Sequence, residues 1–412
     1  MYKSGIANSD LSEAEAYNAI VDLSARQVMA ASVLAAPPYQ KPLGNTELEP
    51  LLFMKEISSD GNMNTMDVLY PTSPFFLYTN PDLLRFALQP LYEMRENSFY
   101  PNDYTMHDLG GNFPNATGHL KGDDEYMPVE ECGNLILMSY AYYKFSGDIS
   151  WLRSHYKTLT DSAQYLLDFS LLPASQMSTD DFNGELANQT NLAIKGIIAL
   201  QAMSSVAIVV ENLENASMYA AKAKEYYVGW EELSVEPSRQ HTVLSYQWTS
   251  SWGLLYNIYF DKLLNIGIVN ESIYNMQSDW YAKVSQVFGV PLDSRKTQTK
   301  SDWQIWAAAT SSSNTREMII RSMATWLDST ASTDPFPDRY ETFGNGQNIG
   351  FKARPVVGGH FALLALAKSG QRANAEGGVM NGSRFSRSGD GFLQVKPVSK
   401  FSKPLKWFEL PS

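Results

Sequence analysis

The sequence is poor in the residues that cross-link a chain or hold soft metals. Among its 412 residues there are one cysteine, Cys132, and five histidines. A disulfide within the chain is therefore excluded, and no histidine or cysteine stands at the tight spacing of a zinc site. Cys132 lies in the stretch EECGNLILM, where we expect a small buried residue. The fold must be held by packing, and we predict neither a metal nor a cofactor.

Basic charge and long hydrophobic runs are scarce as well. The net charge is −12 and the charges are scattered, so no basic stripe is available to neutralise the phosphates of a nucleic acid. No segment reaches the ~18 uninterrupted apolar residues of a membrane span, and the N-terminus lacks the apolar region of a secretory signal. With 44% hydrophobic residues the chain can build a large core. We predict a globular protein with a small-molecule ligand and with neither a nucleic-acid nor a membrane partner.

Apolar residues recur at three- and four-residue steps from end to end, which is the period of an amphipathic helix. Strand-like alternation is almost absent. The pattern predicts eleven helices, at 14–35, 81–96, 129–147, 150–172, 186–210, 216–233, 251–264, 271–289, 301–310, 314–328 and 354–368.

The connections between these helices alternate in length. Short polar turns, such as 145–150 and 211–217, join one helix to the next. The return links are long, rich in Gly, Asp, Asn and aromatics, and they recur about every 55 residues, roughly six times. This period predicts an all-α fold of the (α/α)6 type, a closed six-hairpin toroid whose long links converge at one central cavity. An open superhelical solenoid is the alternative, but its repeats would resemble one another in sequence, and these links do not.

Six long segments carry distinctive motifs in a fixed order. They are KEISSDGNMNTMDVLYPTSPFFLY, YTMHDLGGNFPNATGH, MPVEECGNLILM, STDDFNGELANQTNLAIKGI, GVPLDSRKTQTKSDWQIW and ARPVVGGHFALLAL. Together they resemble the fungal glutaminase A family, from about Tyr17 to about Leu366. The resemblance implies a glycosidase-like six-hairpin toroid and a secreted amidohydrolase that converts L-glutamine to L-glutamate and ammonia. It also implies a β-rich N-terminal region in full-length relatives.

The chain departs from that family at both ends. It begins almost at the first toroid helix, and from about Gly370 its sequence fits neither the family nor a helical pattern. We interpret it as a truncated or altered gene product, with a catalytic toroid over 1–369 and a disordered tail over 370–412. Secretion by family resemblance would make it a glycoprotein, with acceptor sequons at Asn115, Asn188, Asn215, Asn270 and Asn381.

Hydrolysis of an amide or a glycosidic bond needs one group to activate water and another to protonate the leaving atom, and two carboxyl groups of different pKa can serve. The first candidates are Asp180 and Asp181 in STDDFNG. Either acid, or Thr179, could cap the following helix. Because one cap does not explain two acids, we expect one of the pair to face the cavity. A hydroxyl nucleophile, Ser178 or Thr179, stays open.

Two further segments place acids at a turn or at the start of a helix. His107 and Asp108 precede a Gly-Gly turn that a ligand could approach closely, and an Asx-turn beside a packing histidine is the alternative. Glu130 and Glu131 follow Pro128 in a first helical turn, where the helix dipole favours acids in any protein. Glu131 is the better candidate, because the neighbouring apolar pattern turns it inward.

Aromatic residues flank another acid. SDWQIW offers Asp302 beside Trp303 and Trp306, which suits a substrate clamp or an acid of raised pKa. The alternative is a helix cap with both tryptophans in the core. Trp252, at the end of the aromatic link 244–252, is a further candidate for substrate binding.

Cationic candidates for substrate binding are few. Arg354 in ARPVVGGH could bind the α-carboxylate of glutamine through its guanidinium fork, or pair with one of the acids. Lys55 could bind substrate or form a local ion pair with Glu56. The segment 60–67 resembles a calcium loop but lacks its glycine and its final glutamate, so we expect no metal there.

Three functions are compatible with these residues. The first is glutamine amidohydrolysis, with an acid from 180–181 or Asp108 as base, Glu131 or Asp302 as acid, and Arg354 as anchor for the substrate carboxylate. The second is glycoside hydrolysis by two carboxyl groups, which lie ~6.5–9.5 Å apart in inverting enzymes. The third is a non-catalytic toroid that binds a ligand or the β-rich region.

Overall fold

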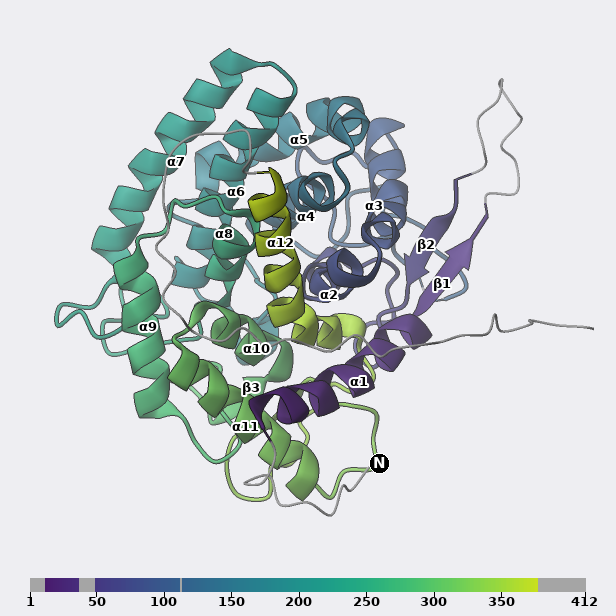
Figure 1. Ribbon diagram of the computed structural model, residues 1–412. Coiled ribbons are helices and arrows are strands. Elements are labelled where there is room, and N and C mark those ends of the chain that lie inside the picture. Colours follow the sequence, from purple (N-terminus) through teal and green to yellow (C-terminus); the bar gives the residue numbers. More distant parts are fainter. Residues whose placement is uncertain (1–11, 37–48, 112, 377–412) are drawn as a thin grey trace, which may run out of the picture.

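Two concentric rings of helices make up most of the chain that the structure describes (Figure 1). The computed structural model describes residues 12–36, 49–111 and 113–376. The outer ring consists of α1 (Glu13–Ala31), α3 (Pro81–Glu96), α5 (Ile149–Phe169), α7 (Leu213–Ser234), α9 (Glu271–Val284) and α11 (Ser313–Ser329). The inner ring consists of α2 (Met66–Thr79), α4 (Pro128–Ser146), α6 (Thr190–Val209), α8 (Tyr259–Leu264), α10 (Ser301–Thr310) and α12 (Ala362–Glu376). Outer and inner helices alternate along the chain.

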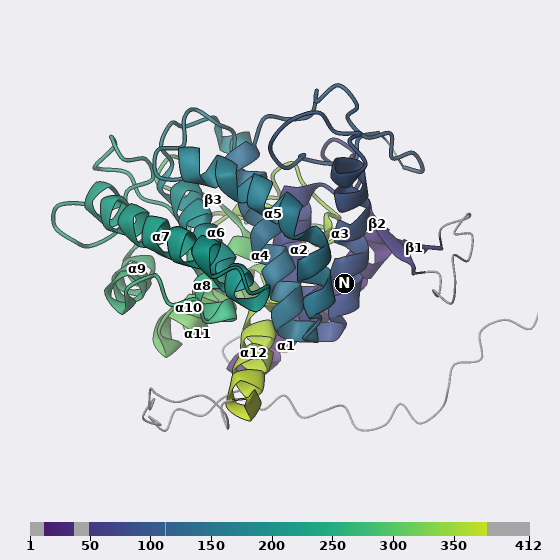
Figure 2. The ribbon, with the colours of Figure 1, turned by 90° about the horizontal axis from the view of Figure 1, so that it is seen from above.

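The connections confirm the alternation of short and long links. Each inner helix up to α10 passes to the next outer helix through a short turn, as at Gly147 and Asp148 between α4 and α5. Gly147 ends α4 in the left-handed conformation (φ 82°), and Asp148 accepts a hydrogen bond from Ser150 N–H at 2.9 Å to begin α5. Long links lead back to the inner ring, and Figure 2 shows the one between α3 and α4 opposite the C-terminal turns of α12. We call the end of the ring where the inner helices begin the link end.

Contacts between the first and last helices close the ring. The 3-10 helix η4 (Pro355–Phe361) packs against α1 and α2, and α12 contacts α2, α8 and α10. Tyr17 of α1 donates a hydrogen bond to the His360 carbonyl at 2.6 Å. The predicted closed toroid is therefore confirmed, and an open solenoid is excluded.

Helix α2 is absent from the predicted set of eleven helices, and the described residues form twelve α-helices. Its interior contains Pro71 and Pro74, which remove backbone donors and argue against a helix in isolation. Within the ring, α2 is buried between α4, α12 and η4, and Thr72 Oγ donates to the Pro355 carbonyl at 2.9 Å. Tertiary packing here overrides a poor intrinsic propensity.

Two small antiparallel sheets accompany the helices. β1 (Ser32–Ala35) pairs with β2 (Leu51–Met54), and β3 (Gln298–Lys300) pairs with β4 (Arg339–Glu341). The first sheet corrects the predicted helix 14–35, because α1 ends at Ala31 and the next residues form β1. The second sheet joins the link before α10 to the link before η4, and it brings two long links together at the link end.

Burial differs between the two rings. On the outer helix α5 the buried residues include Trp151, Leu152, His155 and Leu159, so one face packs inward at steps of three and four. The inner helix α6 is apolar on all sides. It alone among the described helices has the length and composition of a membrane span, yet 78% of that segment is buried inside the ring. Its apolar sequence is accounted for by its central position in the core.

The C-terminal helix crosses the predicted domain boundary. α12 runs on to Glu376, whereas the sequence places the end of the toroid at 369. Residues 377–412 of the predicted tail lie outside the described residues, and the division into toroid and tail stays a prediction.

Candidate active site

Acidic side chains gather at the link end because inner helices begin there. Asp67 lies in the first turn of α2, Glu130 and Glu131 in the first turn of α4, and Asp302 in the first turn of α10. The positive end of a helix favours a carboxylate, while burial disfavours its charge. The ionisation of each acid therefore depends on its neighbours, which differ between two parts of this end.

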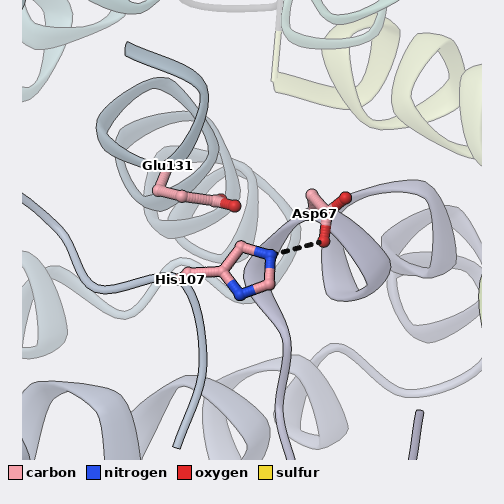
Figure 3. A group of neighbouring side chains, drawn as sticks. All are labelled: Asp67, His107 and Glu131. Atoms are coloured by element: carbon pink, nitrogen blue, oxygen red, sulfur yellow. Dashed lines mark ion pairs between the residues drawn. The ribbon is translucent and has the colours of Figure 1, made fainter. Parts of the chain in front are cut away.

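One part is centred on His107. We call it the histidine side, and it consists of Asp67, His107, Asp108, His119 and Glu131. His107 Nε2 lies 3.6 Å from Asp67 Oδ1 and 3.6 Å from Glu125 Oε2. One ligand atom each of Asp67, His107 and Glu131 lies within 4.8 Å of the others, and Glu131 points toward the other two (Figure 3). Burial lowers the pKa of His107, but the Asp108 hydrogen bond and the charges of Asp67 and Glu131 outweigh burial and hold this pKa well above its usual range.

Asp108 orients both histidines of this side. Its Oδ2 lies 2.7 Å from His107 Nδ1, and its Oδ1 lies 2.8 Å from His119 Nε2. Gly110 N–H also donates to Oδ1, so the Asx-turn alternative is realised together with the histidine contacts. Burial raises the pKa of Asp108, but the hydrogen bonds and charges of His107 and His119 outweigh it and lower the pKa below its usual value. An anion held in this way suits a positioning role better than that of the general base.

The two glutamates of α4 have different partners. Both are 1% exposed, which confirms the prediction that the apolar pattern turns Glu131 inward. Glu130 accepts a hydrogen bond from Lys195 Nζ of α6, which also donates to Asn134 at 2.8 Å. Glu131 accepts from Asn134 Nδ2 at 2.8 Å through Oε2, while its Oε1 has no hydrogen-bond partner among the described residues. Burial, and after it the charge of Asp67, raises the pKa of Glu131 well above its usual range.

The other part of the link end is lined by rings. We call it the aromatic side, and it consists of Asp180, Tyr256, Lys300, Asp302 and Trp303. Tyr256 stacks on Trp303 with ring centroids 4.0 Å apart and donates a hydrogen bond to Asp180 Oδ2 at 2.7 Å. Asp180 Oδ1 is buried and has no hydrogen-bond partner in the described part of the chain. Burial raises the pKa of Asp180 to about 7, against the Tyr256 hydrogen bond, which lowers it.

Asp302 lies in a buried network of charges. Lys300 Nζ lies 3.1 Å from Asp302 Oδ2 and 3.8 Å from Asp338 Oδ2, and all three residues are at most 1% exposed. Burial raises the pKa of Asp302 to about 6, although the charge of Lys300 lowers it. The Oδ1 atom of Asp302 has no hydrogen-bond partner within the described ranges. The expected acid of raised pKa is therefore present.

The cationic candidates have protein partners. Arg354 pairs with Asp338 through an Nη2–Oδ2 contact of 2.8 Å and lies 3.7 Å from Glu56 Oε1. The alternative in which Arg354 pairs with acids is thus realised, and its role as substrate anchor stays a prediction. Glu56 is directed toward Arg354 rather than toward Lys55, whose Nζ lies 5.0 Å from the centroid of the Phe113 ring.

The helix-cap alternatives for the acids are wrong. Helix α6 has Gln189 as its N-cap, well beyond the pair of aspartates, and α10 has Lys300 as its N-cap with no side-chain cap bond. Asp181 begins the short 3-10 helix η2 (Asp181–Asn183), and its side chain lies outside what the structure describes. The side chains of Asp180 and Asp302 therefore do not cap the helices that follow them.

The tryptophans lie deeper than a substrate clamp requires. Trp303 and Trp306 are 0% exposed, which realises the alternative that places them in the core. Trp303 packs against one face of the Tyr256 ring. Trp252 is partly buried, and its ring centroid lies 6.1 Å from that of Trp280 on α9.

Sequence reasoning missed several polar residues of this end, namely Asp67, Lys195, Tyr256, Lys300 and Asp338. Asp67, like Asp302, is an acid in the first helical turn after a long link. The sequence did not indicate this, because Pro71 and Pro74 argue against a helix at α2. Lys195 is a single cation within an apolar helix, and sequence alone gives no sign of its partner.

Three acids that the sequence singles out share one property. Glu131, Asp180 and Asp302 each have a pKa raised by burial and at least one buried carboxyl oxygen without a hydrogen-bond partner among the described residues. The charge of Glu130 acts on both Asp180 and Glu131, so the two sides form one electrostatic unit. Perturbed carboxyl groups with unused oxygens are typical of a catalytic or binding site.

The ring and its acidic end define an all-α, glycosidase-like six-hairpin toroid. A bacterial glucoamylase complexed with acarbose shares the fold with a TM-score of 0.53 at 9% identity, over 74% of this chain and 49% of that one. A rhamnosidase from Klebsiella oxytoca gives a TM-score of 0.51 at 12% identity, over 74% of this chain and 58% of that one. At such identities these likenesses show the fold alone.

The chain belongs to the glutaminase A family. The family model for the glutaminase A six helical-hairpin domain matches residues 14–364. The chain is 48% identical to Glutaminase A of Aspergillus oryzae over 354 residues, 85% of this chain and 50% of the relative. It is 37% identical to a probable glutaminase of Arthroderma benhamiae over 447 residues, 88% of this chain and 51% of the relative. The chain thus spans about half the length of these curated relatives.

Proposed function

We propose that this toroid hydrolyses L-glutamine to L-glutamate and ammonia. The family and the names of the relatives support the substrate. The observation that carries the reaction is the pair of carboxyl groups on the aromatic side, Asp180 and Asp302, each with an unpartnered oxygen and a raised pKa. The charges of both acids act on the phenol of Tyr256.

The different neighbours of the two acids, Lys300 beside Asp302 and Tyr256 beside Asp180, support different roles for them. Asp302, with a pKa of about 6 and Lys300 beside it, is the more readily ionised and acts as the general base. Asp180, with a pKa of about 7, keeps its proton more readily and acts as the general acid. Because Tyr256 donates to Oδ2, the proton of neutral Asp180 belongs on Oδ1, the oxygen without a partner. This assignment reverses the one expected from sequence.

The reaction then follows with its protons balanced. Asp302 takes a proton from water as the water oxygen bonds to the carbonyl carbon of the glutamine side-chain amide. The tetrahedral intermediate collapses, the carbon–nitrogen bond breaks, and the nitrogen takes the proton of Asp180 and leaves as ammonia. The proton held by Asp302 passes through solvent to Asp180 and restores both groups.

Ammonia release from glutamine, measured beside a panel of glycosides, tests the proposal. We expect ammonia release by the wild type and a decrease in kcat of about 10²–10⁴-fold for Asp180→Asn and for Asp302→Asn. The matched control is Asp279→Asn on the exposed face of the outer helix α9, which should retain wild-type activity.

Several outcomes would overturn the proposal. Hydrolysis of a glycoside without ammonia release would support the glycosidase alternative. No activity on either glutamine or the glycosides would support a non-catalytic toroid that binds a ligand. Full activity of Asp180→Asn together with loss in Asp181→Asn would move the acid to the neighbouring residue. A covalent adduct with a glutamine-like electrophile on Ser178 or Thr179 would replace the direct attack of water by a hydroxyl nucleophile.

The setting outside the cell is part of the same proposal. Asn115 and Asn270 are exposed sequon asparagines, while Asn188 and Asn215 are partly buried. Asn381 lies outside the described residues. Mass spectrometry of the secreted protein should find the highest glycan occupancy at Asn115 and Asn270. A secreted protein without glycans would contradict the proposed glycosylation. The β-rich N-terminal region stays a prediction.

A further inference from the structure

We propose that Asp67, His107 and Glu131 bind a divalent transition metal ion, zinc or manganese. The three residues come from the first turn of α2, the link before α4 and the first turn of α4. One ligand atom from each lies within 4.8 Å of the others (Figure 3). An ion placed between them would need only small side-chain movements to reach the ~2.0–2.2 Å of a zinc–nitrogen or zinc–carboxylate bond.

The second ring nitrogen of His107 already has the partner that a metal-bound histidine requires. His107 Nδ1 lies 2.7 Å from Asp108 Oδ2, and Asp108 is held in turn by His119 Nε2 at 2.8 Å. A metal-binding imidazole almost always donates its other N–H to a carboxylate or carbonyl, which fixes the ring and directs its free nitrogen at the ion. Here that arrangement leaves His107 Nε2 facing Asp67 and Glu131.

Unused oxygens face the same space. Glu131 is 1% exposed, and its Oε1 has no hydrogen-bond partner in the ranges that the structure describes. Asp67 Oδ1 likewise accepts no hydrogen bond within those ranges, and its nearest cationic atom is His107 Nε2 at 3.6 Å. A buried carboxyl oxygen without a donor is costly, and a cation satisfies it.

Several acidic side chains surround the ring of His107. Asp67, Asp108 and Glu125 each lie within 3.6 Å of a ring nitrogen of His107, and Glu131 is close by. A divalent ion on a neutral imidazole would supply one more positive charge to these acids than the imidazolium of His107 does. The set of one imidazole and two carboxylates fits zinc or manganese better than calcium or magnesium, which take oxygen ligands alone.

The sequence predicts no metal, because its histidines and its cysteine show no tight spacing of ligands and the segment 60–67 lacks the glycine and the final glutamate of a calcium loop. The three ligands are separated along the chain and meet only where two inner helices begin side by side. The proposal does not depend on the amidohydrolase activity, since metal binding is measured without substrate.

Titration of the chelator-treated protein with zinc chloride, and separately with manganese chloride, tests the site by calorimetry and by the metal content after dialysis. We expect one ion per chain in the wild type. Glu131→Gln and Asp67→Asn should each weaken binding by at least about 100-fold, and Asp108→Asn, which holds His107, by about 10–100-fold. Asp103→Asn, an exposed acid on the same link, is the matched control and should bind like the wild type.

Circular dichroism of each variant separates loss of the site from loss of the fold. Asp67, with 15% of its side chain exposed, provides a second ligand variant if Glu131→Gln unfolds. A wild type that binds neither ion would overturn the proposal and leave a metal-free cluster that shares protons. Wild-type affinity in a folded Glu131→Gln or Asp67→Asn variant would overturn it equally.

Discussion

The histidine side and the aromatic side show two ways of burying acids at one end of a helical ring. On the histidine side, Asp108 touches two imidazoles and a backbone N–H, and its pKa is lowered. On the aromatic side, Asp180 faces Tyr256 and has a single donor, and its pKa rises to about 7. Both residues are aspartates on long links, so the difference comes from the number of donors that surround each one.

That difference shows how one fold can hold an anion and a neutral acid close together. Several charged hydrogen-bond donors compensate for the loss of water around a buried carboxylate. A single phenol hydroxyl, with aromatic rings around it, compensates for that loss only in part. The histidine side is therefore suited to hold a cation and the aromatic side to transfer a proton. Lys195 pairs with Glu130, whose charge acts on Asp180 of one side and on Glu131 of the other.

The largest expected effect comes from removing Lys195, the cation that pairs with Glu130. Lys195 is 0% exposed and pairs with Glu130, so Lys195→Met leaves a buried carboxylate without its partner. We expect a loss of about 3–5 kcal/mol in the free energy of unfolding, measured by urea denaturation at neutral pH. Lys222→Met, which removes one partner of an exposed pair on α7, should change the free energy little. Equal stability of the two variants would show that Glu130 is neutral and that the two sides are independent.

The next effect tests how tightly the aromatic side is packed. A Cβ atom on Gly359 of η4 would lie 2.9 Å from Asp302 Cβ and 3.0 Å from the Pro71 carbonyl oxygen. Gly359→Ala should therefore lower the free energy of unfolding by about 1–3 kcal/mol. Gly370→Ala in α12, where nothing lies within 4 Å, is the control and should be neutral or stabilising by about 0.5–1 kcal/mol. A neutral Gly359→Ala would mean that Asp302 has room to move.

A smaller effect is expected on the pH profile. With Asp302 ionised above about 6 and Asp180 protonated below about 7, kcat/KM should rise through the lower pKa and fall through the upper one. Tyr256→Phe removes the hydrogen bond that lowers the pKa of Asp180, so the alkaline limb should move to higher pH. The acid limb, set by Asp302, serves as an internal reference. A shift of the alkaline limb to lower pH would contradict the assignment of Asp180 as the acid.

The smallest effect is expected at the edge of the histidine side. Lys55 Nζ lies over the Phe113 ring, a contact that contributes about 0.5–1 kcal/mol at an exposed site. Lys55→Met should lower stability by no more than this and leave the KM for glutamine unchanged. A KM raised about tenfold, equivalent to ~1.4 kcal/mol, would instead show that Lys55 binds the substrate.

The sequence by itself determined the toroid. Helical periodicity and the alternation of short and long links can be recognised in one segment without knowing which other segments it contacts. Each pattern reflects which residues of a single hairpin are buried. The same reading placed Glu131, Asp180 and Asp302 at one end. The sequence pattern missed α2, because the segment with Pro71 and Pro74 is held as a helix by contacts with other segments. It also predicted a helix through residues 32–35, which form β1.

The tertiary structure decided the pKa values of these acids and the partners of their side chains. The pKa of Asp180 depends on Tyr256, that of Asp302 on Lys300, and the orientation of His107 on an acid one residue away and a histidine further along the link. A carboxyl group's ionisation is set by burial and by charges within a few ångströms. Lys300 is close to Asp302 in sequence, but the burial of this pair depends on packing with other segments, and Asp180 meets Tyr256 only in the folded ring. For that reason Asp67, His107 and Glu131 become a candidate metal site only when two successive hairpins pack together and bring α2 beside α4.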